Sequence, residues 1–212
     1  MTDRQVNIIE LLKKDVSETE DKKRYDHTLG VVDECGYYAD FVGLGDDDRF
    51  ALECAALLHD VTKNMPRDDA EALCKRHGIK YSDSPTLHQD TCAPYIEEHY
   101  GDVPELCDER ILSAVSKHTT GGENMSECDM ILYIADFTEP GRKYENCVRA
   151  REYIRKECEN INKNDKNARI KVLERAVVTI SRMTIEHLTN KNSYIDKRTS
   201  KTLADMQRRS EE

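Results

Sequence analysis

Two aspartates lie within apolar stretches of the chain, where an ionised side chain is unfavourable. His59 and Asp60 directly follow the apolar residues 55–58, and Asp136 follows the apolar run 130–135. A buried carboxylate destabilises a fold by several kcal/mol unless a cation or several hydrogen bonds compensate its charge. Taken singly, Asp60 also fits an ion pair with Lys63, and Asp136 fits a transition from core to surface. Two such acids in one chain favour a shared metal.

Four of the seven histidines stand at positions that suit nitrogen ligands of a metal. His27 lies within a predicted helix, His59 precedes Asp60, His88 lies early in another predicted helix, and His118 ends a third. Each one alone has a simpler explanation as a half-buried residue at a helix edge, so the joint pattern carries the prediction. The other three are predicted to be surface or packing residues: His77, His99 and His187.

Six residues, in chain order, resemble the ligand pattern of the two-metal HD-domain phosphohydrolase superfamily: His27, His59, Asp60, His88, His118 and Asp136. Motifs spanning residues 24–142 are similar to those of the bacterial YqeK family: Arg24-Tyr25-x-His27-Thr28-Leu29-Gly30, Ala56-Leu57-Leu58-His59-Asp60-x-x-Lys63, Leu87-His88, His118-Thr119-Thr120-Gly121 and Tyr133-x-Ala135-Asp136-x-x-Glu139-Pro140-Gly141-Arg142. The resemblance implies a symmetrical bis(5′-nucleosyl)-tetraphosphatase, which splits diadenosine tetraphosphate into two ADP, usually with a two-iron centre. Val61 and Thr62, which lie between Asp60 and Lys63 in the second motif, are slightly unusual residues for the family at these two positions.

By resemblance, all six residues are expected to bind two metals. One metal is expected on His27, His59 and Asp136, the other on His88 and His118, with Asp60 as the bridging carboxylate. A hydroxide between the metals is the expected nucleophile for attack on a phosphoanhydride. Mixed imidazole and carboxylate ligands suit iron, manganese, cobalt, nickel or zinc better than magnesium or calcium. Iron itself is implied by the resemblance alone.

Cations near the ligands predict how a polyphosphate would be held. Asp60 and Lys63 are the expected catalytic residues, because three residues' spacing puts both on one side of a helix. The predicted substrate-binding residues are Arg24, Lys63, Thr119, Thr120, Gly121 and Arg142. Solvated surface positions explain the three cations equally well, and ordinary turn chemistry explains residues 119–121.

Composition restricts the partners. The 32 Lys/Arg against 42 Asp/Glu give a net charge of −10, which disfavours binding to a nucleic-acid polymer. Neither a signal peptide nor an apolar membrane span is recognisable, so we expect a cytoplasmic protein without membrane contact. Eight cysteines without a C-x-x-C pair are predicted to be reduced thiols. The expected partner is a small dinucleoside polyphosphate, and a homodimer is one option for assembly.

Apolar residues recur at intervals of three and four, which predicts an all-α fold, an HD-domain helical bundle of about eight to ten helices. Expected helices begin at a Ser17-x-x-Glu20 capping box, at Asp46, at Ser84-Pro85, at Pro104 and at Ser126, and the Asp46 helix is expected to reach Lys63. Residues 1–190 are predicted to form a single domain with the metal-ligand core at 24–142. The polar tail 191–212 is expected to be a loosely docked helix or a frayed end.

Two other functions fit the same residues. One is an HD-type hydrolase acting on another nucleotide or a phosphorylated metabolite. The other is a non-catalytic, nucleotide-sensing HD module, which would bind metal without turnover. Six intact ligand positions argue against the second, because a module that has lost catalysis is expected to lose ligands.

Overall fold

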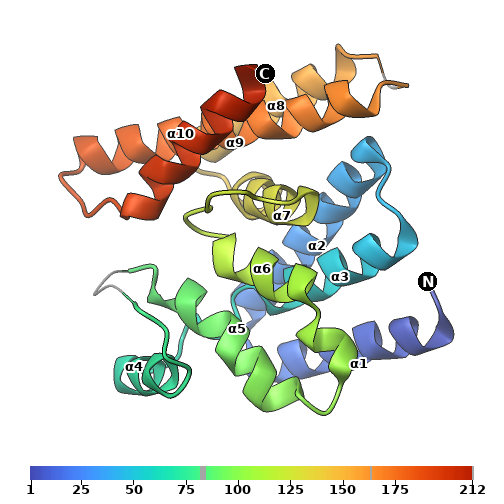
Figure 1. Ribbon diagram of the computed structural model, residues 1–212, viewed down its shortest axis with the longest axis vertical. Coiled ribbons are helices and arrows are strands. Elements are labelled where there is room, and N and C mark those ends of the chain that lie inside the picture. Colours follow the sequence, from blue (N-terminus) through green and yellow to red (C-terminus); the bar gives the residue numbers. More distant parts are fainter. Residues whose placement is uncertain (82–84, 163, 212) are drawn as a thin grey trace.

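The computed structural model describes residues 1–81, 85–162 and 164–211, and within them the chain is helical, with no strand (Figure 1). The predicted all-α bundle is therefore confirmed. The helices are α1 (Asp3–Thr19), α2 (Lys22–Val42), α3 (Asp46–Leu58), α4 (Arg67–Arg76), α5 (Leu87–Tyr100), the 3-10 helix η1 (Pro104–Cys107), α6 (Glu109–Lys117), α7 (Glu127–Thr138), α8 (Glu145–Glu159), α9 (Lys166–Asn190) and α10 (Lys197–Glu211).

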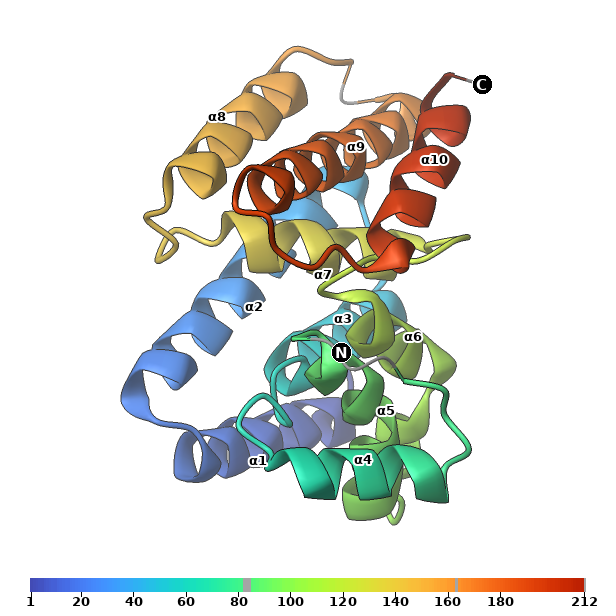
Figure 2. The ribbon, with the colours of Figure 1, turned by 90° about the vertical axis from the view of Figure 1, so that its left-hand side faces the viewer.

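Helix α7 runs through the centre of the bundle, and residues 128–135 of it are all buried. It packs against α2, α6 and α9 and also touches α3 and α8. Helices α8, α9 and α10 form a layer over it, while α1 and α4 lie at the opposite end of the molecule (Figure 2). A nearly continuous apolar sequence is what a helix surrounded on all sides requires.

Several predicted helix ends are wrong. Helix α1 continues through Ser17, whose hydroxyl donates to the Lys14 carbonyl (2.7 Å), and α2 begins instead after Asp21, whose carboxylate accepts the Arg24 N–H (3.0 Å). The S-x-x-E pattern is therefore no capping box here, because its serine bonds to the turn before it. The expected N-cap Ser84 lies outside the described residues, and α5 begins at Leu87.

The segment after α3 is the most consequential difference. Helix α3 ends at Leu58, and residues 59–64 continue as turns in which the Lys63 N–H donates to the Asp60 carbonyl (2.8 Å). His59 and Asp60 therefore leave the helix where its regular backbone bonding stops. Pro104 likewise opens only the 3-10 helix η1, and α6 starts separately after Asp108, whose side chain caps it.

Residues 197–211 form a docked helix rather than a frayed end. Met206 of α10 is fully buried, and Arg198 forms ion pairs with Asp90 of α5 and with Asp196. The docking is also firmer than expected, since α10 packs closely against α9. The all-polar appearance of this segment concealed a narrow buried stripe of Thr199, Thr202 and Met206.

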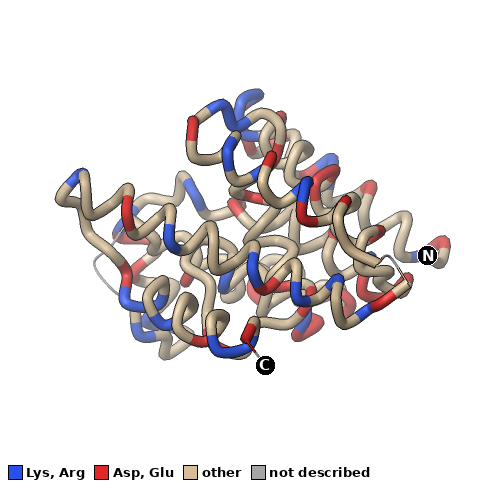
Figure 3. Tube along the Cα trace, turned by 90° about the horizontal axis from the view of Figure 1, so that it is seen from above, with Lys and Arg blue, Asp and Glu red and all other residues tan. Residues whose placement is uncertain are grey.

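Two further predictions concern the chain as a whole. All eight cysteines are free thiols, as predicted, and seven of them are buried. Among the described residues, no helix combines the length and the apolar character that a bilayer crossing needs. Lys and Arg positions are interspersed with Asp and Glu along the chain (Figure 3).

Candidate metal centre

The structure brings all six predicted ligands into one buried cluster. They come from five different places in the fold: His27 from α2, His59 and Asp60 from the turn after α3, His88 from the first turn of α5, His118 from the end of α6, and Asp136 from α7. Helix ends and the turn after α3 supply most of these positions. A helical bundle can therefore assemble the cluster from residues more than a hundred positions apart.

Asp60 lies at the centre of the cluster and is only 4% exposed. Its Oδ1 is 3.6 Å from the Nε2 atoms of both His88 and His118. Its Oδ2 is 3.6 Å from His59 Nε2 and 4.0 Å from His27 Nε2. One carboxylate thus divides its two oxygens between two pairs of imidazoles.

Two sets of possible ligands share this carboxylate. In each set one ligand atom per residue lies within 4.8 Å of the others; the sets are His27, His59 and Asp60, and Asp60, His88 and His118. Asp136 extends the first set, because its Oδ1 lies 3.2 Å from His27 Nε2 and 4.0 Å from His59 Nε2. This division matches the expected one, with Asp60 between two half-sites.

Hydrogen bonds turn the histidine rings toward Asp60. The Nδ1–H of His59 donates to the Ala56 carbonyl and that of His118 to the Val115 carbonyl, both at 2.7 Å. Since a carbonyl only accepts, Nδ1 carries the proton in each ring and Nε2 keeps its lone pair. Backbone carbonyls in this role fix the ring orientation that a metal ligand needs.

Glu139 orients His27 in the same way, and sequence reasoning assigned it no role. Its Oε1 accepts from His27 Nδ1 (3.1 Å), and its Oε2 accepts the Gly141 N–H. A Cβ on Gly30 would lie 2.7 Å from that Oε2, so the close approach of α2 to Glu139 requires glycine there. The signal that could have identified Glu139 is a glycine inside a helix, one turn after a candidate ligand.

Three buried polar atoms in the cluster test whether metals fit it. His27 Nε2, His59 Nε2 and Asp60 Oδ1 have no hydrogen-bond partner among the described residues. A buried polar atom without a hydrogen-bond partner is unfavourable by about 1–3 kcal/mol, so three unpaired atoms in one cluster need a common explanation. Imidazole nitrogens around a carboxylate form a donor set for divalent transition metals, and the residues present fit such ions.

Protonation states agree with that fit. Burial lowers the pKa of His59 to about 4, and burial together with the ammonium of Lys63 lowers the pKa of His88 to about 3. Burial opposes ionisation of Asp60, but the neighbouring His59, His118 and Lys63 outweigh it and hold its pKa below the usual range. Neutral imidazoles and an ionised carboxylate are the forms that bind metal at neutral pH.

The predicted cations also lie at the cluster. Lys63 Nζ is 3.5 Å from Asp60 Oδ1 and 2.8 Å from His88 Nε2. Arg24 forms an ion pair with Asp60, and Arg142 forms one with Asp136. The position of Lys63 follows from the turn after α3, not from the helical geometry that the sequence suggested.

Only one of the three predicted residues after His118 faces the cluster. The Thr119 hydroxyl lies 3.0 Å from His88 Nε2. Thr120 points away, with its N–H (2.8 Å) and its hydroxyl (3.2 Å) donating to Gln89 Oε1. Gly121 has φ 69° and packs against Thr202 of α10, so its part is to turn the chain.

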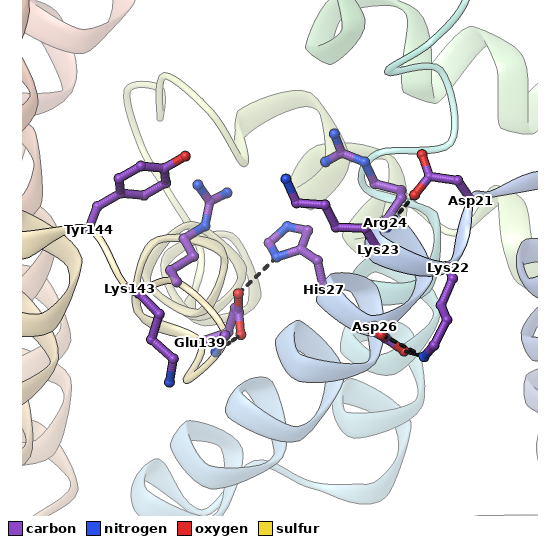
Figure 4. Close-up of a pocket in the computed structure, with 11 residues that line it drawn as sticks. Asp21, Lys22, Lys23, Arg24, Asp26, His27, Glu139, Lys143 and Tyr144 are labelled. Carbon is purple, nitrogen blue, oxygen red and sulfur yellow. Dashed lines mark hydrogen bonds and ion pairs between the residues drawn. The ribbon is translucent and has the colours of Figure 1, made fainter.

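A cavity of about 1040 Å³ opens beside the His27 side of the cluster (Figure 4). The start of α2 forms one wall, and the segment between α7 and α8 forms the other. Both Arg24 and Arg142 line it and also contact the cluster. Its size is at the upper end of typical small-molecule sites, about 300–1000 Å³.

Comparison with known proteins supports the assignment from motifs. The HD domain family model matches residues 24–141. The symmetrical bis(5′-nucleosyl)-tetraphosphatase of Halalkalibacterium halodurans is 31% identical over 132 residues, covering 60% of this chain and 67% of that protein. The protein of the same name from Staphylococcus aureus is 32% identical over 139 residues, covering 63% and 68%.

A solved structure shows the same fold. The predicted HD superfamily hydrolase from Clostridium acetobutylicum, described as involved in NAD metabolism, aligns with a TM-score of 0.74 at 23% identity and covers 94% of this chain and 97% of its own. The family model and the relatives confirm the resemblance to HD-domain phosphohydrolases. The chain belongs to the HD domain family of phosphohydrolases.

Proposed function

We propose that this protein is a metal-dependent hydrolase that splits diadenosine tetraphosphate symmetrically into two ADP. The observation that carries the proposal is Asp60, a buried carboxylate shared between two imidazole pairs at the end of a cation-lined cavity. Relatives named symmetrical bis(5′-nucleosyl)-tetraphosphatase support the choice of substrate. The same proposal places the enzyme in the cytoplasm, with a small dinucleoside polyphosphate as its partner.

The reaction needs water, a stabilised leaving group and neutralised phosphates. The six residues of the cluster would hold two metal ions, iron in this proposal, which would supply Lewis acidity and lower the pKa of water. The bond between the central bridging oxygen and one central phosphorus breaks, water oxygen bonds to that phosphorus, and two protons are released as two ADP ions form. A central scissile bond leaves a nucleoside diphosphate on each side.

The chain's own residues bind and orient the phosphates. Lys63 places its ammonium group within 4 Å of both Asp60 and His88, so it can contact a phosphate held at the cluster. Arg24 and Arg142 lie where the cavity meets the cluster and offer planar guanidinium groups suited to phosphate oxygens. The Thr119 hydroxyl adds one further hydrogen-bonding group on the His88 side.

The decisive experiment is product analysis. Purified protein with measured metal content is incubated with diadenosine tetraphosphate, and the products are separated by chromatography. ADP as the sole product supports the proposal, whereas ATP with AMP rejects symmetrical cleavage. Turnover of another nucleotide or phosphorylated metabolite, with diadenosine tetraphosphate left intact, would replace the proposed substrate.

Asp60→Ala tests the shared carboxylate. Without it both half-sites lose a ligand, so we expect bound metal to fall and turnover to disappear while helix content is kept. Asp33→Ala is the matched control, because Asp33 is an exposed aspartate on α2. Full turnover in Asp60→Ala refutes the bridging role.

A further inference from the structure

The cavity beside the cluster extends beyond the residues that contact the ligands. Lys23, Lys143 and Tyr144 line it without a hydrogen bond or ion pair to any of the six candidate ligands within the described part of the chain. Arg24 and Arg142 line the part that meets Asp60 and Asp136. The cavity thus has an inner part with two arginines beside the cluster and an outer part with two lysines and a tyrosine.

Cations outnumber acids in the lining of this cavity, although the net charge of the chain is −10. Its lining contains five cations, Lys22, Lys23, Arg24, Arg142 and Lys143, and three acids, Asp21, Asp26 and Glu139. Local surplus charge of one sign in a concave surface attracts ligands of the opposite sign. The cavity therefore favours an anion.

The three acids are already engaged by neighbouring groups. Asp26 pairs with Lys22 Nζ at 2.8 Å, and Asp21 accepts the Arg24 N–H. Glu139 accepts from His27 and from the Gly141 N–H. Lys23, by contrast, has no ion pair with any residue that the structure describes, and Figure 4 shows it extending on the same side of α2 as His27.

Tyr144 adds an aromatic surface to the outer part. It is 73% exposed, more than any other large hydrophobic side chain in the described part of the chain. It lies at the N-cap of α8, across the cavity from Lys23 and Arg24 (Figure 4). An exposed ring beside phosphate-binding cations offers a stacking face to a nucleobase, since every base has a π face.

We propose that this outer part binds one nucleoside diphosphate half of the substrate, with Lys23 near its phosphates and Tyr144 stacked on its base. The inference rests on the proposed function for the identity of the whole substrate. Tyr144 would thus recognise a nucleotide rather than any polyphosphate.

Equilibrium binding to the metal-loaded protein tests this without relying on turnover. ADP and inorganic pyrophosphate are titrated into wild type, Tyr144→Ala, Tyr144→Phe and Lys23→Ala by calorimetry. Base stacking predicts that Tyr144→Ala weakens ADP binding about 5-fold or more and leaves pyrophosphate binding unchanged. Tyr144→Phe should bind both as wild type does, and Lys23→Ala should weaken both.

Tyr153→Ala is the matched control, because Tyr153 is an exposed tyrosine on the same helix that does not line the cavity. Equal ADP affinity in wild type and Tyr144→Ala overturns the proposal, as does an equal loss of ADP and pyrophosphate binding. If these affinities follow the prediction but diadenosine tetraphosphate is not cleaved, the nucleotide site stands and the proposed function fails.

Discussion

Gly30→Ala perturbs the candidate metal centre without altering any residue that could bind metal. A Cβ at position 30 would lie 2.7 Å from Glu139 Oε2 and 3.3 Å from Glu139 Cδ. To restore an ordinary contact of 3.4 Å, the carboxylate has to retreat by about 0.7 Å. The hydrogen bond from His27 Nδ1 to Glu139 is already 3.1 Å long, so such a shift breaks it or rotates the ring.

The expected result is a metal affinity 10- to 100-fold lower at the half-site of His27, roughly the effect of losing an outer hydrogen-bond partner of a ligand. Competition with a chelating indicator dye measures that affinity, and thermal unfolding reports stability separately. Glu139→Gln should show the same loss, because a neutral amide replaces the charged acceptor.

Gly36→Ala is a stringent control on the same helix. Nothing lies within 4 Å of a Cβ at that position, so the substitution should only add helix propensity, about 1 kcal/mol of stability. Gly30→Ala gains the same propensity but loses the position of Glu139. If both variants bind metal equally tightly, Glu139 does not position His27.

Two further predictions concern contacts far from the substrate cavity. Thr202→Val removes the hydroxyl that donates to the Thr120 carbonyl (3.1 Å), so we expect the free energy of unfolding to fall by about 1–2 kcal/mol and metal binding on the His118 side to weaken. Thr202→Ser should restore both the stability and the metal affinity. Unchanged metal affinity in Thr202→Val would exclude a role for this contact. Arg155→Met leaves Glu34 buried without its ion-pair partner and should lower the free energy of unfolding by about 2–3 kcal/mol, at or below the low end for buried pairs because the Arg155 side chain is 28% exposed. Burial raises the pKa of Glu34, so the folded state holds the Glu34 proton more tightly than the unfolded state, and the contribution of Glu34 to the free energy of unfolding falls as pH rises. The loss of unfolding free energy in Arg155→Met should therefore become smaller as pH is lowered from 8 to 5, which denaturant titrations measure. Arg149→Met, at an exposed position on the same helix, should show no such loss.

The two aspartates of the cluster were predictable because they conflict with their surroundings in the sequence, whereas the full set of six residues came from the resemblance to a known family. An aspartate after four apolar residues has few structural explanations, and Asp60 and Asp136 meet at one place through the histidines that lie between them. That conflict is local and visible in any window of about ten residues. The helical character of the fold was equally local, since the spacing of apolar residues fixes it.

The helix ends were less predictable because long-range contacts decide them. Helix α3 stops at Leu58 although the residues up to Thr62 allow a further turn, and the turns that follow place Lys63 beside His88. The contact between Lys63 and His88 depends on where α5 packs, and the spacing of residues in the sequence does not predict that position. Ser17 failed as a cap for the same reason, since nothing in S-x-x-E tells an interior serine from a terminal one.

Glu139 and α10 were missed because their roles depend on residues distant in the chain. Glu139 acts on His27, 112 positions earlier, and its only local sign was a glycine in each of two partner segments. Helix α10 has few apolar residues, yet Thr202 and Met206 are fully buried against the rest of the bundle. A short buried stripe in a polar helix is easily taken for a solvated segment.

The docking of α10 also bears on the order in which the protein is made. The loop after His118 is tied to Thr202 and Asp205 through the Thr120 carbonyl and the Asn124 N–H. Translation delivers these partners about eighty residues after the loop itself. The contacts that tie this loop to α10 can therefore form only after the C-terminal segment has been synthesised.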